Sequence, residues 1–324
     1  MPFLTDRHNA NNPAVDFEPS QFSEELTARL NDVIVGQHAA VDAVVRAAAI
    51  ASARLGEADS PLVSMLFVGP TGVGKTELVR QLAASLRSDV EDFCRIDMNA
   101  LSQEHYAASF NGAPPGYSGS REMTSLFNVD QVEGDLARPG IVLFDEIEKA
   151  HPVVIRALLH VLDTGVLRMA TGAGRISFRN CIVVMTSNLG FNSSMESRDD
   201  ESDPLQAIRD FFDPEFFNRI DEIVEFGPLT VDTIGTVATN ELTRLARRLR
   251  ARHVQLTWDP AAIGVLMNIG FDPRYGAREL RRVLRREVVH PVAEEVLRAI
   301  PGRERPLHLH LTARDDASLA VRTE

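Results

Sequence analysis

Lysine is almost missing from this chain of 324 residues. Only Lys75 and Lys149 occur, so arginine supplies the other 32 of the 34 basic residues. A lysine that is kept in such a sequence is a candidate for a chemical role, and Lys75 lies in a glycine-rich segment.

Long apolar runs are also missing. None approaches the ~18 residues of a membrane span, and residues 1–22 are polar, without the apolar segment of a signal peptide. The two cysteines, Cys94 and Cys181, each belong to an apolar, strand-like run. This setting favours buried thiols over a disulfide or a metal site. We therefore expect a cytoplasmic protein with no membrane partner.

Basic residues are outnumbered by acidic ones, and the formal net charge is −12. Residues 1–228 hold 18 basic and 34 acidic residues, whereas residues 229–324 hold 16 and 12. The acidic first part argues against a nucleic-acid partner, which needs a basic face. The arginine-rich second part fits either a solvated or subunit-facing helix or a nucleic-acid contact.

Short apolar segments alternate with helical ones through the first two-thirds of the chain, as in a parallel α/β sheet. The predicted strands are Val63–Val68, Phe93–Ile96, Ile141–Phe144 and Cys181–Met185. The predicted helices are Gln37–Arg54, Glu77–Leu86, His151–Leu162 and Pro204–Phe212. Residues 192–203 are polar and acidic, which is typical of a surface loop.

The pattern changes after Gly227 and Pro228. It predicts helices at Val231–Arg252, Pro260–Asn268 and Gly276–Ala299, the last with a break near Pro291, and a strand at Leu307–Thr312. We therefore predict four parts along the chain. These are a flexible segment 1–24, a large α/β domain 25–228, a small mainly helical domain 229–312 and a tail 313–324.

A phosphate-binding loop is predicted between the first strand and the helix that follows it. Its members are Gly69, Pro70, Thr71, Gly72, Val73, Gly74, Lys75 and Thr76. Glycines let backbone N–H groups turn toward phosphates, and the helix N-terminus adds its positive dipole end. In this pattern Lys75 would reach the β- and γ-phosphates of ATP, and Thr76 would hold Mg²⁺. A purely structural turn is the alternative.

Two later strands end in polar residues that complete such a site. Asp145 and Glu146 follow four apolar residues, at the strand end where α/β sheets bind ligands. Asp145 would organise Mg²⁺, and Glu146 would orient or deprotonate the attacking water. Asn188 follows the next strand and would lie beside the γ-phosphate, or else it caps a loop.

The motifs as a set resemble the Clp-type AAA+ module, and most of all the second ring of the disaggregases. They are GPTGVGKTE, GAPPGY, VLFDEIEKAHP, FRN…MTSNLG, PEFFNRIDEIV and GFDPRYGARELRR, and they cover roughly residues 25–312. The resemblance implies a five-stranded parallel sheet with a helical lid. It also implies a homo-oligomeric ring, usually of six subunits, with ATP bound between neighbours.

The resemblance assigns roles to five further residues. Ile34 and Val35 would pack the adenine, Arg219 would be the arginine finger given to the next subunit, and Arg278 would be the nucleotide-sensing arginine of the lid. Tyr117 would grip polypeptide in the central pore. Without the resemblance, the arginines are surface or ion-pair residues and Tyr117 is a packed loop tyrosine.

The sequence departs from the family pattern at Ser118, where the pore motif usually has an aliphatic residue, and at Asp213, where an arginine is common. It also shows no substrate domain, first ring or coiled-coil insertion. The tripeptides Leu189–Phe191 and Ile269–Phe271 match a peptidase-docking signal, but both lie within other motifs, so we expect no peptidase partner.

We therefore expect an ATP-driven protein unfoldase that acts on protein substrates as a ring, and the sequence leaves open an unidentified adaptor. One alternative is a nucleotide-switched assembly or adaptor ATPase. Another is a DNA-associated AAA+ motor, which the acidic large domain opposes.

Overall fold

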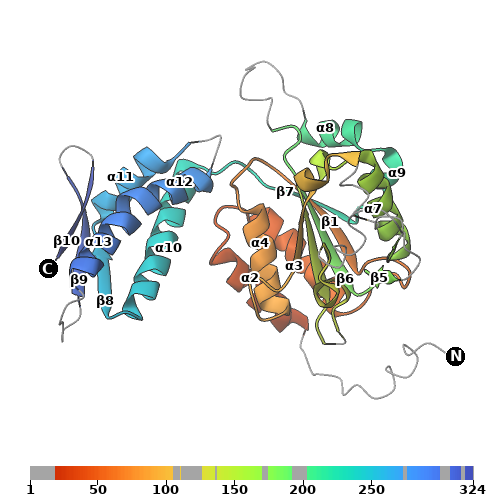
Figure 1. The fold of residues 1–324 in the computed structure, drawn as a ribbon, viewed down its shortest axis with the longest axis horizontal. Helices are drawn as coiled ribbons and strands as arrows, with labels where there is room; N and C mark the ends of the chain where they lie inside the picture. Colours follow the sequence, from red (N-terminus) through yellow and green to blue (C-terminus); the bar gives the residue numbers. More distant parts are fainter. Residues whose placement is uncertain are drawn as a thin grey trace.

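The computed structural model describes residues 19–104, 110, 126–135, 137–169, 174–191, 203–272, 276–299, 307–314 and 318–323. In these ranges the chain forms a larger and a smaller part that lie side by side (Figure 1). The larger part contains a five-stranded sheet, and the smaller part combines helices with a three-stranded sheet. None of the helices described here is both long enough and apolar enough to cross a bilayer.

The central sheet has the strand order β2-β3-β6-β1-β7, and each neighbouring pair is parallel. Its strands are β1 (Val63–Val68), β2 (Cys94–Asp97), β3 (Gly140–Asp145), β6 (Cys181–Ser187) and β7 (Glu222–Glu225). This confirms the predicted parallel sheet; four strands lie where the sequence predicts them, and β7 is additional. Because the strands are parallel, the carboxyl ends of β1, β3 and β6 meet at one edge, where such sheets bind ligands.

Helices cover both faces of this sheet (Figure 1). Helices α2 (Pro19–Asn31), α3 (His38–Ser52) and α4 (Lys75–Leu86) pack on one face, and α7 (Pro152–Thr164) packs on the other. In β1, Met65 belongs to the core on the first face and Leu66 to the core on the second, and both are fully buried. A strand that is buried on both faces has a continuous apolar sequence, which is the pattern seen in β1.

Shorter elements connect these layers. They are η1 (Met98–Leu101), α6 (Val129–Glu133), η3 (Ile147–Lys149), β4 (Val166–Arg168), β5 (Arg175–Ser177), α8 (Pro204–Phe211) and α9 (Pro214–Phe217). Strands β4 and β5 form an antiparallel pair, and residues 170–173 between them lie outside the described residues.

The helix α2 begins at Pro19, inside the segment 1–24 that the sequence analysis expects to be flexible. Leu26 and Leu30 of this helix are buried, and Phe22 packs against the same core. A spacing of four residues places these side chains on one helix face, so apolar burial orders this part of the segment.

The lid, as we name the smaller part from residue 229 onward, contains more β-structure than the sequence predicts. Its elements are α10 (Val231–Arg250), β8 (Val254–Trp258), α11 (Pro260–Gly270), α12 (Ala277–Leu284), η4 (Arg285–Val289), α13 (His290–Ala299), β9 (Leu307–Ala313) and β10 (Leu319–Thr323). Strand β9 pairs with β8 in parallel and with β10 antiparallel. The segment 313–324, predicted as a tail, therefore adds a strand to this sheet.

The break predicted near Pro291 takes the form of a π-helical turn, which interrupts the α-helical pattern but does not end the helix. Helix α12 continues through the π-helical turn η4 into α13, and the N–H of His290 donates to the carbonyl of Arg285. Proline lacks an N–H group, but it is tolerated in the first turn of a helix, where that group has no intrahelical partner. The wider turn therefore takes up the proline without ending the helix.

Candidate functional site

The glycine-rich loop joins β1 to α4, as the sequence predicts. Gly74 has φ 111° and caps the N-terminus of α4, a conformation that side chains other than glycine rarely adopt. The loop therefore delivers Lys75 and Thr76 at the start of the helix, where N–H groups and the helix dipole favour anions.

The side chain of Lys75 turns into the protein and is only 8% exposed. Its Nζ donates to the carbonyls of Gly69 and Pro70 and, at 2.7 Å, to Oδ1 of Asn188. Burial lowers the pKa of Lys75 from 10.5 to about 8, and the carboxylates of Glu148, Asp145 and Glu146 oppose this shift. The charged amine thus lacks the full solvation that water or a phosphate group would give it.

Asp145 ends β3 and is fixed by two neighbours. Its Oδ1 accepts from the hydroxyl of Thr186 at 2.6 Å, and its Oδ2 accepts from Nη2 of Arg95 at 2.5 Å. The hydroxyl of Thr186 in turn accepts the backbone N–H of Glu146 at 2.9 Å. Thr186 therefore sets the positions of both predicted acidic residues.

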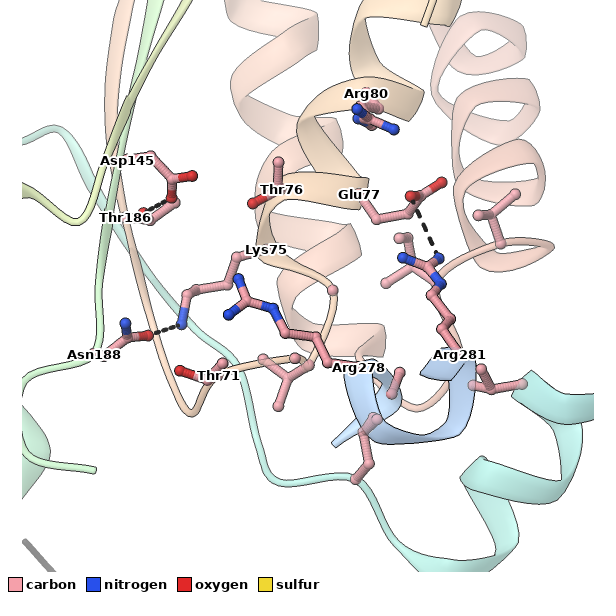
Figure 2. A pocket seen from close by; sticks show the side chains of 18 of the residues that line it. Thr71, Lys75, Thr76, Glu77, Arg80, Asp145, Thr186, Asn188, Arg278 and Arg281 are labelled. Carbon is pink, nitrogen blue, oxygen red and sulfur yellow. Dashed lines mark hydrogen bonds and ion pairs between the residues drawn. The ribbon is translucent and has the colours of Figure 1, made fainter. Parts of the chain in front are cut away.

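Asn188 lies between Lys75 and Glu146 and is hydrogen-bonded to both. Its amide accepts from Lys75, and its Nδ2 donates to Oε1 of Glu146 at 3.3 Å. Its backbone N–H donates to Oε1 of Glu148 at 3.2 Å, while Oε2 of Glu148 is buried without a hydrogen-bond partner. The residues predicted from three separate strand ends thus meet in one hydrogen-bonded group. Figure 2 shows two of its bonds, Lys75 to Asn188 and Thr186 to Asp145.

A cavity of about 300 Å³ opens beside this group and extends to the lid. Its apolar side is formed by the predicted adenine-packing residues Ile34 and Val35 with Leu229, Val237 and Ala277. The neighbouring Gln37 is buried and exchanges two hydrogen bonds with the backbone of Gly227, at 2.9 and 3.0 Å. The lining therefore combines apolar residues with charged ones, as a nucleotide site requires.

The lid contacts the phosphate loop directly. The backbone N–H of Ala277 donates to the carbonyl of Gly72 at 3.1 Å, and a Cβ on Gly276 would lie 2.9 Å from the same oxygen. Arg278 extends from α12 toward Lys75 (Figure 2) and contributes to the lowering of the pKa of Lys75. The predicted lid arginine thus lines the same cavity as the loop.

The predicted arginine finger is not brought into the cavity. Arg219 is not among the lining residues and pairs with Asp163 at 2.7 Å. Tyr117 lies outside the described residues, as do Ser118 and most of the predicted surface loop 192–203.

The arrangement fits a magnesium-bound nucleotide. The hydroxyl of Thr76 and the carboxylate of Asp145 lie on facing sides of the gap in Figure 2, and both offer the oxygen ligands that Mg²⁺ prefers. Within the part of the chain that is described, Nζ of Lys75 is hydrogen-bonded only to neutral oxygens, so a phosphate group would give it a directly bonded anion.

Several residues at the site have no signal in the sequence. Arg95 and Arg80 line the cavity, and Glu77 of α4 forms ion pairs with Arg281 and Arg244 of the lid. Among 32 arginines, no spacing rule separates these from surface residues. The position of Glu77 directly after Thr76 is the one clue that the sequence offers.

Two family profiles match the chain. One is described as an AAA domain (Cdc48 subfamily) and matches residues 60–223. The other is described as the C-terminal, D2-small domain of ClpB protein and matches residues 229–303.

Three relatives illustrate the similarity. The chain is 48% identical to the "ATP-dependent protease ATP-binding subunit-like protein" of Rhodococcus erythropolis, with 98% of each chain covered. It is 42% identical to the "ATP-dependent protease ATP-binding subunit-like protein AmiB" of Pseudomonas aeruginosa, over 87% of this chain and 80% of that one. It is 39% identical to the "Chaperone protein ClpB" of Vibrio cholerae, over 86% of this chain but only 33% of the relative.

Proposed function

Because the chain belongs to the Clp-type AAA+ ATPases, we propose that its ATPase drives protein remodelling by a homo-oligomeric, six-membered ring. The observation that carries this proposal is the meeting of Lys75, Asp145 and Asn188 with Arg278 of the lid around one cavity. A site closed by the lid couples the state of the nucleotide to the position of the lid. Such coupling is what a motor that moves polypeptide requires.

Each residue of the site has a part in the proposed hydrolysis. Lys75 and the loop amides bind the phosphates, and Thr76 and Asp145 hold the cation that neutralises them. Glu146 accepts the proton of the attacking water, and Asn188, which donates to Glu146 at 3.3 Å, keeps that carboxylate in place. The bound magnesium nucleotide supplies the bond to be cleaved and the charge that these groups stabilise.

Further steps require a neighbour and a substrate. Arg219 would enter the adjoining subunit's site, and Tyr117 would grip an extended polypeptide in the centre of the ring. The relatives' names support both a chaperone and a protease-linked role for those proteins. For this chain we propose no peptidase partner, because Phe191 and Phe271 of the two docking-like tripeptides pack against the hydrophobic cores.

The test separates threading from hydrolysis. Tyr117→Ala should keep its ATPase rate but lose ATP-dependent unfolding of a tagged protein. Tyr117→Phe, which keeps the aromatic side chain, should retain both activities. Unfolding by Tyr117→Ala at the normal rate would contradict threading and favour a nucleotide-switched assembly protein.

Glu146→Gln identifies the substrate and any adaptor. Loss of the general base should stop turnover while ATP stays bound, so proteins held by the ring should copurify with this variant. Recovery of DNA in place of protein would support the DNA-associated alternative.

A further inference from the structure

Arg95 forms an ion pair with Asp145, the residue that is expected to organise the metal. It lies on the edge strand β2, opposite Leu143 of β3, and its guanidinium reaches Asp145 at the strand end. Both Nη2, at 2.5 Å, and Nε, at 3.2 Å, donate to the same oxygen, Oδ2.

This pairing uses the acceptor capacity that a hydrated cation needs. A carboxylate oxygen has about two lone-pair sites, and two N–H groups of Arg95 take both sites on Oδ2 of Asp145. On the other oxygen, Oδ1, the hydroxyl of Thr186 uses one lone-pair site. Water molecules of a metal ion donate to such oxygens, so they compete with Arg95 for Oδ2.

The two partners differ in how firmly they are held. The side chain of Asp145 is 14% exposed and is also bound by Thr186, whereas that of Arg95 is 48% exposed. Ion pairs with a solvated partner contribute little free energy, so the guanidinium can leave at low cost. Arg95 also lines the nucleotide cavity, so it has phosphate groups within its surroundings when a nucleotide binds.

We propose that Arg95 is a positioning residue that keeps Oδ2 of Asp145 closed to the cation until nucleotide phosphates attract the guanidinium. This inference rests on the proposed nucleotide site. In the free protein Arg95 stays on Asp145, and in the loaded protein it turns to the phosphates and releases Oδ2. The device favours binding of metal and nucleotide together over binding of metal alone.

The test compares Arg95→Met with Arg80→Met in the full chain, with calorimetry for Mg²⁺ binding in the absence of nucleotide and the fluorescence of N-methylanthraniloyl-ADP for nucleotide binding. Arg80 lines the same cavity but pairs with Glu91, so its loss removes the same charge without touching Asp145. In Arg95→Met the Mg²⁺ concentration for half-maximal binding to the nucleotide-free protein, measured by titration calorimetry, should fall roughly two- to fivefold. The nucleotide Kd at saturating Mg²⁺ should rise, and the Mg²⁺ midpoint of Arg80→Met should stay at the wild-type value.

A positioning role should lower the Mg²⁺ midpoint and raise the nucleotide Kd. General damage to the site would raise both the midpoint and the Kd. An unchanged midpoint, or an equal shift in Arg80→Met, would overturn the inference while leaving the proposed site standing. Wild-type binding that needs no Mg²⁺ would overturn the proposed site and the inference together. If Arg95→Met does not fold, Arg95→Lys decides, because an ammonium donates less to Oδ2 and should lower the midpoint by a smaller factor.

Discussion

The guanidinium of Arg219 is bound by Asp163 of the same chain, with 2.7 Å between Nη2 and Oδ1. The backbone beneath it is tied to β1, because the hydroxyl of Ser64 lies 2.9 Å from the carbonyl oxygen of Arg219 and 2.8 Å from Oδ2 of Asp221, and its one proton can be donated to either. The side chain, by contrast, is 49% exposed. Arg219 is therefore a half-exposed, ion-paired side chain on a fixed backbone, and in the proposed ring its guanidinium would have to leave Asp163 to reach a neighbouring subunit.

A complementation assay tests whether Arg219 acts in a neighbour. Arg219→Ala should lower ATP hydrolysis by about 10³-fold or more, with nucleotide binding unchanged. Glu146→Gln should be inactive for a different reason. An equal mixture should regain activity, because some sites then combine Glu146 of one variant with Arg219 of the other. Steady-state ATPase rates of the mixture measure this gain.

Two controls accompany this assay. Asp163→Asn keeps Arg219 and removes only an exposed ion pair worth about 1 kcal/mol or less, so it should fold normally and hydrolyse ATP. Arg209→Ala removes a nearby arginine that lies over the ring of Phe217, keeps both Glu146 and Arg219, and should hydrolyse ATP on its own at the wild-type rate. A mixture of Arg219→Ala and Glu146→Gln that stays inactive would argue that the arginine does not act between subunits.

The contact of Gly276 with the phosphate loop gives a second prediction. Gly276 has φ 53°, and a Cβ there would lie 2.9 Å from the carbonyl oxygen of Gly72 and 3.2 Å from that of Thr71. Gly276→Ala should therefore cost about 1–3 kcal/mol of unfolding free energy and weaken nucleotide binding by displacing the loop.

Gly264→Ala is the matched control, because a Cβ on Gly264 in α11 meets no atom within 4 Å. It should stabilise the lid by about 0.5–1 kcal/mol, as alanine is preferred in a helix interior. Denaturant unfolding and nucleotide titration measure both variants. Equal effects of the two substitutions would show that the loop contact is unimportant.

Glu77 links the nucleotide-binding helix to the lid. Its Oε2 lies 3.7 Å from Nη2 of Arg281, and its Oε1 lies 4.0 Å from Nη2 of Arg244. A double-mutant cycle of Glu77→Gln and Arg281→Met should give a coupling free energy of about 0.2–1 kcal/mol, because these side chains are partly solvated. Urea unfolding of the four proteins measures it.

Arg282 provides the control for this cycle. It lies next to Arg281 on α12 but pairs with Glu279 and is 76% exposed. Glu77→Gln and Arg282→Met should therefore be additive within about 0.5 kcal/mol. Equal coupling for both arginines would mean that Glu77 senses the general charge of the helix and not one partner.

Local motifs made the nucleotide site predictable from the sequence. The loop around Lys75 is contiguous, and Asp145 and Asn188 each follow an apolar strand, so parallel pairing alone brings them together. The ion pairs of Arg95, Arg219 and Arg281 were not predictable. Each joins residues 50 or more positions apart, and the abundance of arginine hides the ones that matter.

Short elements of the lid also escaped prediction. Strand β10 has only five residues, and it is stabilised by pairing with β9 and by burial of Leu319 and Ala320. Such a segment has no periodicity long enough to be read without its partner. By contrast, α10 is a 20-residue helix with a clear apolar face, and its predicted start at Val231 is confirmed.

The buried amine of Lys75 predicts a pH dependence of its own. Because burial lowers its pKa from 10.5 to about 8, the folded, nucleotide-free protein binds fewer protons than the unfolded chain between these two values. Its stability should therefore rise with pH across this window. Nucleotide binding needs the charged amine, so affinity should fall as the pH passes above about 8.

Lys75→Met isolates this contribution from other titrating groups. The variant lacks the buried charge, so it should be more stable than the wild type at pH 7, and the difference should shrink as the pH approaches 10. Urea unfolding at pH 7, 8.5 and 9.5 measures the difference, and calorimetry near pH 8.5 should detect proton uptake when nucleotide binds to the wild type. A stability difference that stays constant with pH would mean that Lys75 keeps its proton throughout, and that the carboxylates around it outweigh its burial.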